Sequence, residues 1–312
     1  MNSDITSSST TIALSRKPKR WESPLAGYLF LMPWIVGILV LVAYPMVMSF
    51  YYSLTNYTIL DTPEWVGFQN YSEILFEDDT FRQSLKVTLL FVLFAVPFKL
   101  LFALVVAMLL NKEIRGLSFY RTMIYFPSLI GGSIAISILW KNIFGKEGFI
   151  NQLIGIFGFE GKSWINSPDT ALATLILLVV WQFGSSMVIF LAGLKQIPLD
   201  LYEAASVDGA DWFVKFRKIT LPMLSPIILF NLVMQTITAF QMFTQAFIIT
   251  KGGPINSTYV YVMYLYELGF ARFQMGYASA LAWILLLIIA IATALVFLSS
   301  RQWVFYENEG GK

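Results

Sequence analysis

Between two long apolar segments the chain reads EAASVDGA from Glu203 to Ala210, and the insert closes with ITLP from Ile219 to Pro222. The segments on both sides are long enough to cross a bilayer, for which a helix needs about 20 apolar residues. A short amphipathic helix in a loop of a membrane protein presents a docking surface to the water phase. This insert and the segments around it determine how the rest of the sequence is interpreted.

The composition indicates a membrane protein. The chain has 312 residues, of which 57% are hydrophobic and 13% charged, and its mean hydropathy is +0.68. A soluble domain carries about 25% charged residues. A net charge of +2 does not suggest nucleic-acid binding. The sequence has no Cys and no His, which removes thiol chemistry, the commonest general base and the commonest transition-metal ligand, so no enzymatic activity is predicted.

Apolar runs predict the fold class, an all-α polytopic membrane protein with six transmembrane helices. The predicted spans are Ala26–Met48, Val87–Leu110, Thr122–Ile143, Ala171–Leu194, Met223–Ile249 and Ala278–Leu298. The first span is too long for a signal peptide and no clear cleavage site follows it, which favours a retained anchor.

Lys and Arg residues predict the orientation. Thirteen of the 21 lie in the N-terminal tail, in the loops after the second and fourth spans, and in the C-terminal tail, whereas seven lie in the opposite loops. Cytoplasmic loops carry the excess of Lys and Arg, so both termini and the insert are expected in the cytosol. The first cytoplasmic groups are Arg16, Lys17, Lys19 and Arg20 in the tail, and Lys112, Arg115 and Arg121 in the next loop.

The insert is expected to form two short helices. Pro198 and Pro222 bracket it and should interrupt a helix. Asp200 is expected to be the N-cap of the first piece, with Glu203 completing a capping box. Gly209 allows a bend, and Asp211 can cap a second piece. Two such helices can fill a groove on a partner protein or lie on the lipid surface, and the spacing leaves both alternatives open.

The run Glu203-Ala204-Ala205-x-x-Asp208-Gly209-Ala210, followed by Ile219-x-Leu221-Pro222, resembles the EAA loop of ABC importer permeases. More narrowly, the chain is similar to sugar permeases of the maltose and glycerol-phosphate type. Further matching runs extend the resemblance over nearly the whole chain: Leu31-Met32-Pro33, Thr250-Lys251-Gly252-Gly253-Pro254 and Met275-Gly276-Tyr277-Ala278.

This resemblance implies a set of partners. Such permeases pair with a second, homologous permease, stand on two copies of a cytosolic ABC ATPase, and receive an oligosaccharide from an extracellular sugar-binding lipoprotein. By this analogy the cytoplasmic coupling helix, between spans four and five, docks on the ATPase through Glu203, Ala204, Ala205, Asp208, Gly209 and Ala210.

No cofactor is expected in this chain, since ATP and Mg would be bound by the ATPase subunits. Gly161-Lys162-Ser163 lacks the glycine that a phosphate-binding loop needs five positions earlier.

The resemblance also divides the chain and places it in a bacterial plasma (inner) membrane. The expected parts are a cytoplasmic basic tail (1–25), the first span with an extracellular cap loop (26–85), an ABC transmembrane type-1 permease domain (86–300), and a cytoplasmic C-terminal tail (301–312). The acidic run from Asp61 to Asp79 and the segment around Gly252–Thr258 are candidate contacts for the binding protein.

Polar residues inside the spans are candidates for the substrate path, because such residues usually face the bundle interior. Gln235, Thr238, Met242 and Gln245 share one face of a helix. Family members line their sugar cavity with this part of span five, so the resemblance supports this face by position. Hydrogen bonding between helices is the alternative role. The remaining candidates are Gln182, Ser185, Gln241 and Lys99.

Lys99 is the one charged residue deep in a span. It lies eleven residues before Leu110, about 16 Å along a helix and near the midplane. An unpaired ammonium there costs at least about 2.5–3.5 kcal/mol. Lys99 either faces the cavity and favours an acidic sugar, or pairs structurally with a carbonyl group or with the partner permease.

A secondary sugar transporter without an ATPase partner is the alternative function. Such transporters usually show repeated halves or intramembrane carboxylates. The sequence shows no repeat, and no Asp or Glu lies inside a predicted span. The sequence therefore favours the ATP-driven importer.

Overall fold

The computed structural model describes residues 24–112 and 116–305. The predictions made for the basic tail, for Arg115 and for Lys312 lie outside these residues. The chain forms two compact units, residues 1–51 and 52–312. In the first unit, α1 (Pro24–Ile38), the π-helical turn η1 (Leu39–Ala43) and α2 (Tyr44–Ser53) follow one another as a single apolar helix. This helix continues five residues beyond the predicted end of the first span.

The second unit begins with a small cap. Strands β1 (Thr55–Asn56) and β2 (Glu64–Trp65) pair antiparallel, with Thr55 opposite Trp65, and α3 (Gln69–Phe76) follows. The amide of Asn70, at the start of α3, donates hydrogen bonds to the carbonyl oxygens of Ser53 (2.9 Å) and Thr55 (3.0 Å). The loop predicted as an ordered cap therefore has secondary structure and internal hydrogen bonds.

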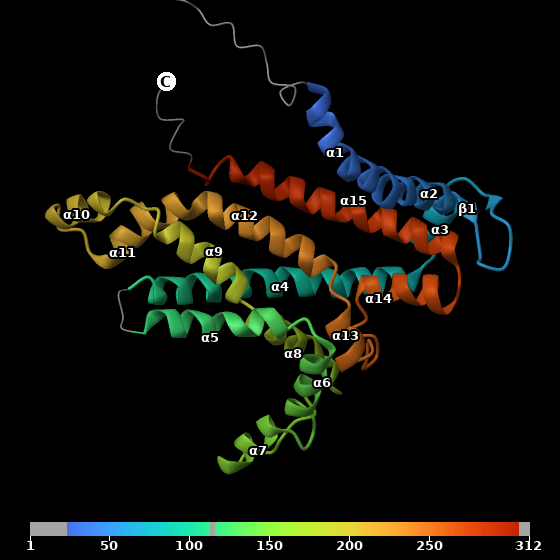
Figure 1. The fold of residues 1–312 in the computed structure, drawn as a ribbon. Coiled ribbons are helices and arrows are strands. Elements are labelled where there is room, and N and C mark those ends of the chain that lie inside the picture. Colours follow the sequence, from blue (N-terminus) through green and yellow to red (C-terminus); the bar gives the residue numbers. More distant parts are fainter. Residues whose placement is uncertain (1–23, 113–115, 306–312) are drawn as a thin grey trace, which may run out of the picture. The chain divides into compact units, whose positions relative to one another are not determined.

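The remaining helices of this unit are α4 (Asp79–Leu110), α5 (Leu117–Ile130), α6 (Ile134–Ile143), α7 (Phe149–Ile156), α8 (Pro168–Trp181), α9 (Gly184–Leu194), α10 (Leu199–Val207), α11 (Trp212–Lys215), η2 (Phe216–Thr220), α12 (Leu221–Phe240), α13 (Thr244–Ile249), α14 (Tyr261–Tyr266), η3 (Glu267–Ala271) and α15 (Met275–Ser300). Figure 1 places α10 and α11 at one end of the unit, and α3, α13 and α14 at the other.

Four helices in the described ranges are long and apolar enough to cross a membrane: Gly27–Ser53, Asp79–Leu110, Trp212–Ile249 and Met275–Ser300. The third and fourth predicted spans are bent pairs instead. Helices α5 and α6 meet at 99°, and α8 and α9 at 43°. The first of these breaks falls at Gly131 and Gly132, after which the Ser133 hydroxyl caps α6 by accepting from the Ile136 N–H. The fold is helical as predicted, while the number of six spans stays a prediction.

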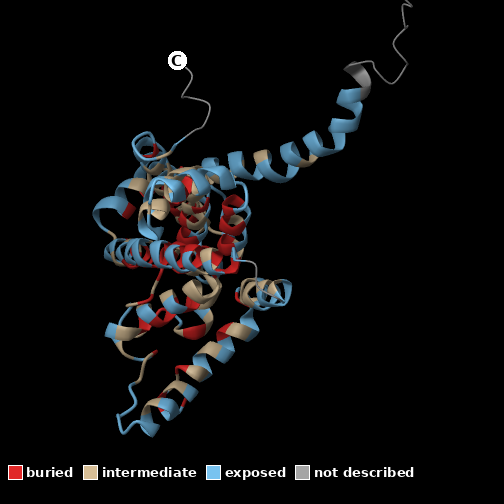
Figure 2. Cartoon of the chain, turned by 90° about the vertical axis from the view of Figure 1, so that its left-hand side faces the viewer, coloured by how far each residue is buried: buried red, intermediate tan, exposed pale blue. Residues whose placement is uncertain are grey.

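Helix α4 is the centre of the second unit and packs against α8, α9 and α12. Its buried side chains recur every fourth residue, at Val87, Phe91, Ala95, Lys99, Ala103 and Ala107. Such an i, i+4 ridge packs into the grooves of neighbouring helices, and the small alanines allow close approach. Figure 2 shows the buried residues gathered where these helices face one another.

The expectation that Pro222 interrupts the helix is wrong. The chain is helical from Trp212 through Pro222 to Phe240, and the π-helical turn η2 ends two residues before the proline. In the first unit, η1 likewise ends two residues before Pro45. A proline lacks an N–H and clashes with the carbonyl group four residues earlier. The wider i→i+5 turn redirects the preceding carbonyl groups, so that the helix continues.

Asp78 connects three helices of the fold through its carboxylate. Its carboxylate accepts hydrogen bonds from the Phe81 N–H (2.8 Å), the Tyr264 hydroxyl (2.5 Å) and the Tyr277 hydroxyl (2.8 Å). It thereby caps α4 and ties it to α14 and α15. Of the acidic run predicted to meet a binding protein, this member is explained by internal hydrogen bonding.

Glu267 joins a second polar cluster near α14. The Tyr259 hydroxyl donates to its carboxylate, and Arg272 forms an ion pair with it at 2.6 Å. The Tyr259 hydrogen bond is the main cause that lowers the pKa of Glu267 below its usual value of 4.5, Arg272 adds to it, and burial opposes both. Because the folded-state pKa is lowered, ionised Glu267 stabilises the fold above pH 4.5, and this contribution is lost as the pH falls through the folded pKa.

We therefore expect the wild-type thermal midpoint to fall on acidification more steeply than that of Glu267→Gln, which cannot titrate. Thermal unfolding in detergent between pH 7 and pH 3 measures the difference, and Glu64→Gln, at an exposed carboxylate of β2, serves as the control. Parallel pH profiles for wild type and Glu267→Gln would contradict the assigned pKa direction.

Candidate functional site

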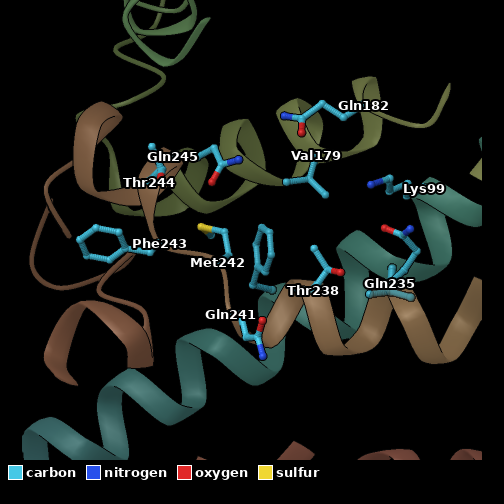
Figure 3. A pocket seen from close by; sticks show the side chains of 13 residues that line it. Lys99, Val179, Gln182, Gln235, Thr238, Gln241, Met242, Phe243, Thr244 and Gln245 are labelled. Carbon is cyan, nitrogen blue, oxygen red and sulfur yellow. The ribbon is translucent and has the colours of Figure 1, made fainter. Parts of the chain in front are cut away.

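A polar cavity of about 240 Å³ lies where α4, the α8–α9 junction and the end of α12 meet. Its lining residues are Phe91, Val96, Lys99, Val179, Gln182, Gln235, Thr238, Ala239, Gln241, Met242, Phe243, Thr244 and Gln245. Seven of the eight residues predicted for the substrate path are among them. Figure 3 shows their side chains arranged around the common space.

The cavity depends on a break in the predicted fifth span. Helix α12 ends at Phe240 and α13 begins at Thr244, with Phe243 outside helical geometry at φ −136° and ψ −62°. The predicted fifth span, Met223–Ile249, lies within the candidate span Trp212–Ile249, and the helix is interrupted inside it. The break brings Gln241, Met242 and Gln245 to the cavity, together with Gln235 and Thr238 from the last turns of α12.

Gln182 takes part in interhelical hydrogen bonding and also borders the cavity. It lines the cavity, and its amide also donates to the Gly131 carbonyl oxygen at 3.0 Å. Its own backbone carbonyl accepts from the Ser128 hydroxyl at 3.1 Å. Gln182 therefore ties the bend between α8 and α9 to the bend between α5 and α6. A Cβ on Gly131 would overlap the Gln182 side chain, so the glycine makes this contact possible.

Ser185 is the predicted path residue that does not line the cavity. Its backbone N–H donates to the Ser128 hydroxyl oxygen at 3.1 Å, at the junction of α5 and α9. Thr238 does line the cavity, and its hydroxyl donates to the Met234 carbonyl oxygen at 2.8 Å. The Thr238 oxygen keeps its lone pairs as acceptors for a bound hydroxyl group.

Lys99 is the only charged residue among those lining the cavity. It is 7% exposed, and its side-chain ammonium forms no hydrogen bond or ion pair with another residue in the described part of the chain. The Gln182 and Gln235 amides lie near it in Figure 3, on opposite sides of the cavity. The predicted pairing with a carbonyl group is not present within the described residues.

At the far end of the unit, the predicted coupling helix is α10. It begins after Pro198, and no side chain caps it, so the expectation of Asp200 as N-cap is wrong. Asp200 lies in the first helical turn, where a carboxylate interacts favourably with the helix dipole. The proline has the extended backbone that an N-cap position needs, at φ −58° and ψ 133°.

Gly209 ends α10 as predicted. It has a left-handed φ of +75°, and the Ala210 N–H donates to the Ala205 carbonyl oxygen at 2.8 Å. This hydrogen bond is the signature of a Schellman motif, which favours glycine at the left-handed position. Asp211 then caps α11 as predicted, its carboxylate accepting from the Val214 N–H at 2.7 Å.

One face of α10 is tied to the following helix, and the other is free in this chain. The Tyr202 and Thr220 hydroxyls share a hydrogen bond of 2.9 Å, and the Lys215 ammonium donates to the Ser206 hydroxyl at 2.7 Å. In the EAA motif, Glu203, Ala204, Asp208 and Gly209 are exposed, while Ala205 and Ala210 are partly buried. Val207, 89% exposed, adds an apolar side chain to the free face.

A helical membrane unit with a polar cavity and an exposed loop helix at one end defines a transport permease. Residues 80–304 match the family described as binding-protein-dependent transport system inner membrane component, and the chain belongs to this family. It is therefore an ABC-transporter permease subunit of the inner membrane, and the secondary-transporter alternative is not favoured.

Individual relatives agree with this assignment. The chain is 52% identical over 288 residues to the probable ABC transporter permease protein YesP of Bacillus subtilis (strain 168), covering 91% of this chain and 93% of that protein. It is 33% identical over 286 residues to the lactose transport system permease protein LacF of Rhizobium radiobacter, covering 88% and 94%. A solved bacterial alginate ABC transporter, in complex with an alginate pentasaccharide-bound periplasmic protein, contains a chain of the same fold. Its TM-score is 0.77 at 21% identity, and the match covers 89% of this chain and 94% of that one.

Proposed function

We propose that this chain is one of two permease subunits of an ATP-driven importer of sugars or oligosaccharides, and that the 240 Å³ cavity belongs to the sugar path. The cavity is the observation that carries the proposal. In this cavity, the side-chain amides of three glutamines from the α12–α13 segment and the Thr238 hydroxyl lie beside aromatic and apolar surface. Amides and hydroxyls match the donors and acceptors of a sugar, while apolar surface packs against the faces of its ring.

Curated relatives support the sugar class by name. They include transport permeases for lactose, for starch degradation products, for multiple sugars and for arabinooligosaccharides. The identity to these relatives is between 29% and 33% over 88–93% of this chain. A common architecture, in which the side chains of the cavity differ according to the sugar, accounts for this range of substrates.

Coupling to ATP is assigned to α10 and to partner subunits. In this proposal the exposed motif from Glu203 to Ala210 docks in a groove of a cytosolic ATPase, and two ATPase copies bind ATP and Mg. Closure of the ATPases on ATP moves the docked helix, and the permease helices respond by rigid-body alternating access. This chain takes no part in the hydrolytic chemistry.

The opposite end of the unit, with the β1–β2 cap, α3, α13 and α14, then faces outward and receives the sugar-binding lipoprotein (Figure 1). Both termini lie in the cytosol of a bacterial cell in this arrangement. The basic tail (1–25), the first span with its cap (26–85), the permease domain (86–300) and the C-terminal tail (301–312) keep the roles that the sequence predicts.

The test is sugar-dependent ATP hydrolysis by the whole importer. The chain is assembled in nanodiscs with its second permease, the ATPase and the binding protein, and hydrolysis is measured with a panel of neutral and acidic oligosaccharides. We expect the loaded binding protein to stimulate hydrolysis for at least one sugar. Hydrolysis that responds to no sugar, in a complex that assembles and binds ATP, would contradict the proposed function.

A further inference from the structure

We propose that Lys99 makes the cavity selective for sugars that carry a carboxylate, such as uronate-containing oligosaccharides. The proposal rests on the proposed function, since it names the substrate class of the same cavity. Four observations support it: the place of Lys99 on its helix, the lack of an internal partner, the character of its neighbours, and the direction of its side chain.

Packing alone does not explain a lysine at this position. Lys99 belongs to the ridge of α4 that is buried every fourth residue, between Ala95 and Ala103. These two neighbours are fully buried at 0% exposure, and the ridge as a whole is otherwise apolar. An alanine or leucine would fill such a position without bringing a charge into the bundle.

The described residues offer this ammonium no partner of opposite charge. Both ion pairs in the described ranges, Arg82 with Asp79 and Arg272 with Glu267, lie outside the cavity. No Asp or Glu is among the cavity-lining residues. A buried charge without a partner is costly, and intramembrane charges mark substrate and ion pathways for this reason.

The remaining polar groups around the cavity are neutral. Gln182, Gln235 and Thr238 supply hydrogen-bond donors and acceptors without charge. Figure 3 shows the Lys99 amine directed into the space that these side chains border. A sugar in this space can therefore place hydroxyl groups against the amides and a carboxylate against the ammonium.

The charge would act differently on acidic and neutral sugars. A carboxylate that enters an uncharged cavity loses its hydration without compensation, whereas a neutral sugar does not meet this cost. Lys99 offsets the loss for the carboxylate alone. A lysine also contacts an anion as a flexible point charge rather than through the rigid bidentate fork of an arginine. Such a contact suits transport, because the substrate must leave the cavity again.

The test compares each acidic sugar with its own neutral counterpart. Uronate-containing di- to tetrasaccharides of glucuronate, galacturonate, mannuronate and guluronate are imported into proteoliposomes by the complete importer, at saturating binding protein. The same oligosaccharides are then used after reduction of their carboxyl groups to primary alcohols, which keeps the ring configuration. We expect wild type to import at least one acidic oligosaccharide faster than its reduced counterpart.

Variants at Lys99 assign this preference to the ammonium. We expect Lys99→Met to lower the ratio of acidic-sugar import to reduced-sugar import on the order of tenfold or more. Lys99→Arg should keep the preference. Lys86→Met is the matched control, because it removes an exposed lysine from the same helix outside the cavity. If Lys99→Met does not assemble, Lys99→Gln is measured with the same expectation.

Three outcomes would overturn the inference: wild type imports the acidic and reduced sugars equally, the variant retains the preference, or the variant loses import of both sugars to the same extent. The third outcome would show that Lys99 has a structural role and pairs with the second permease. An importer that takes up neutral sugars but no uronate contradicts the inference and leaves the proposed function standing. An importer that takes up neither kind of sugar contradicts the proposed function.

Discussion

Replacement of Gly209 by tryptophan is expected to abolish coupling between ATP hydrolysis and import while leaving this chain folded. Gly209 is exposed, and a Cβ at this position would meet no other atom within 4 Å. Its left-handed φ of +75° costs a non-glycine residue only about 1–2 kcal/mol. A bulky ring at the end of α10 would instead obstruct a partner that closes over Glu203–Gly209. A coupling free energy of about 1–3 kcal/mol corresponds to a loss of 5–150-fold, and we expect the upper end.

Gly158→Trp is a matched control. Gly158 is also exposed, has a φ of +80° and has no atom within 4 Å of the position of a Cβ, but it follows α7 rather than α10. Co-purification of the ATPase and ATP-driven sugar uptake are measured for both variants. Wild-type import by Gly209→Trp would exclude docking through this end of α10. An equal loss of ATPase binding in Gly158→Trp would assign the effect to backbone strain.

The second large effect is expected at Gly276, at the start of α15. Its N–H donates to the Tyr57 carbonyl oxygen at 2.9 Å, so the helix and the cap touch through their backbones. A Cβ here would overlap the Thr55 carbonyl oxygen and lie 3.0 Å from the Tyr57 nitrogen. Backbone atoms of a paired strand cannot turn away as a flexible side chain can. We expect Gly276→Ala to destabilise the protein by about 3 kcal/mol.

Thermal unfolding in detergent measures this effect, for which we expect a drop of roughly 5–10 °C in the midpoint. Gly132→Ala is the control, since Gly132 is exposed and a Cβ there would have no neighbour within 4 Å. An unchanged midpoint for Gly276→Ala would show that β1 can shift away from α15 at little cost.

Long apolar runs made most of the helices predictable, but the bends depend on features that a run does not show. The break at Gly131 is explained by the contact with Gln182, which lies about fifty residues further along the chain. The break after Phe240 contains no proline or glycine, so no local signal marks it. At Pro222 the local signal was present but was overridden by a π-helical turn. Of the three cases, the break at Gly131 is the one that a tertiary contact explains.

The cavity was more predictable than the bends that form it. Polar residues in an apolar span are few, and exclusion from lipid directs them to the interior. This reasoning identified Gln235, Thr238 and Lys99 from sequence, and the structure brings them to one space. Ser185 does not line this cavity, and its N–H contacts Ser128 at a helix junction, which is the other role that small polar residues take between helices. The aromatic lining by Phe91 gave no signal, since the sequence around it is uniformly apolar.

The unbroken helix from Trp212 to Phe240 has a mechanical consequence. Its 29 residues form a rod about 44 Å long, with the turn beside Gly209 at one end and Gln235 and Thr238 near the other. A tilt of about 10° around one end would displace the opposite end by roughly 8 Å, more than the rise of one helical turn, which is about 5.4 Å. The interruption of the helix at Gln241–Phe243 allows the rod to move independently of α13. In the proposed arrangement, a small displacement at the end near Gly209 is therefore amplified into a larger displacement near Gln235 and Thr238.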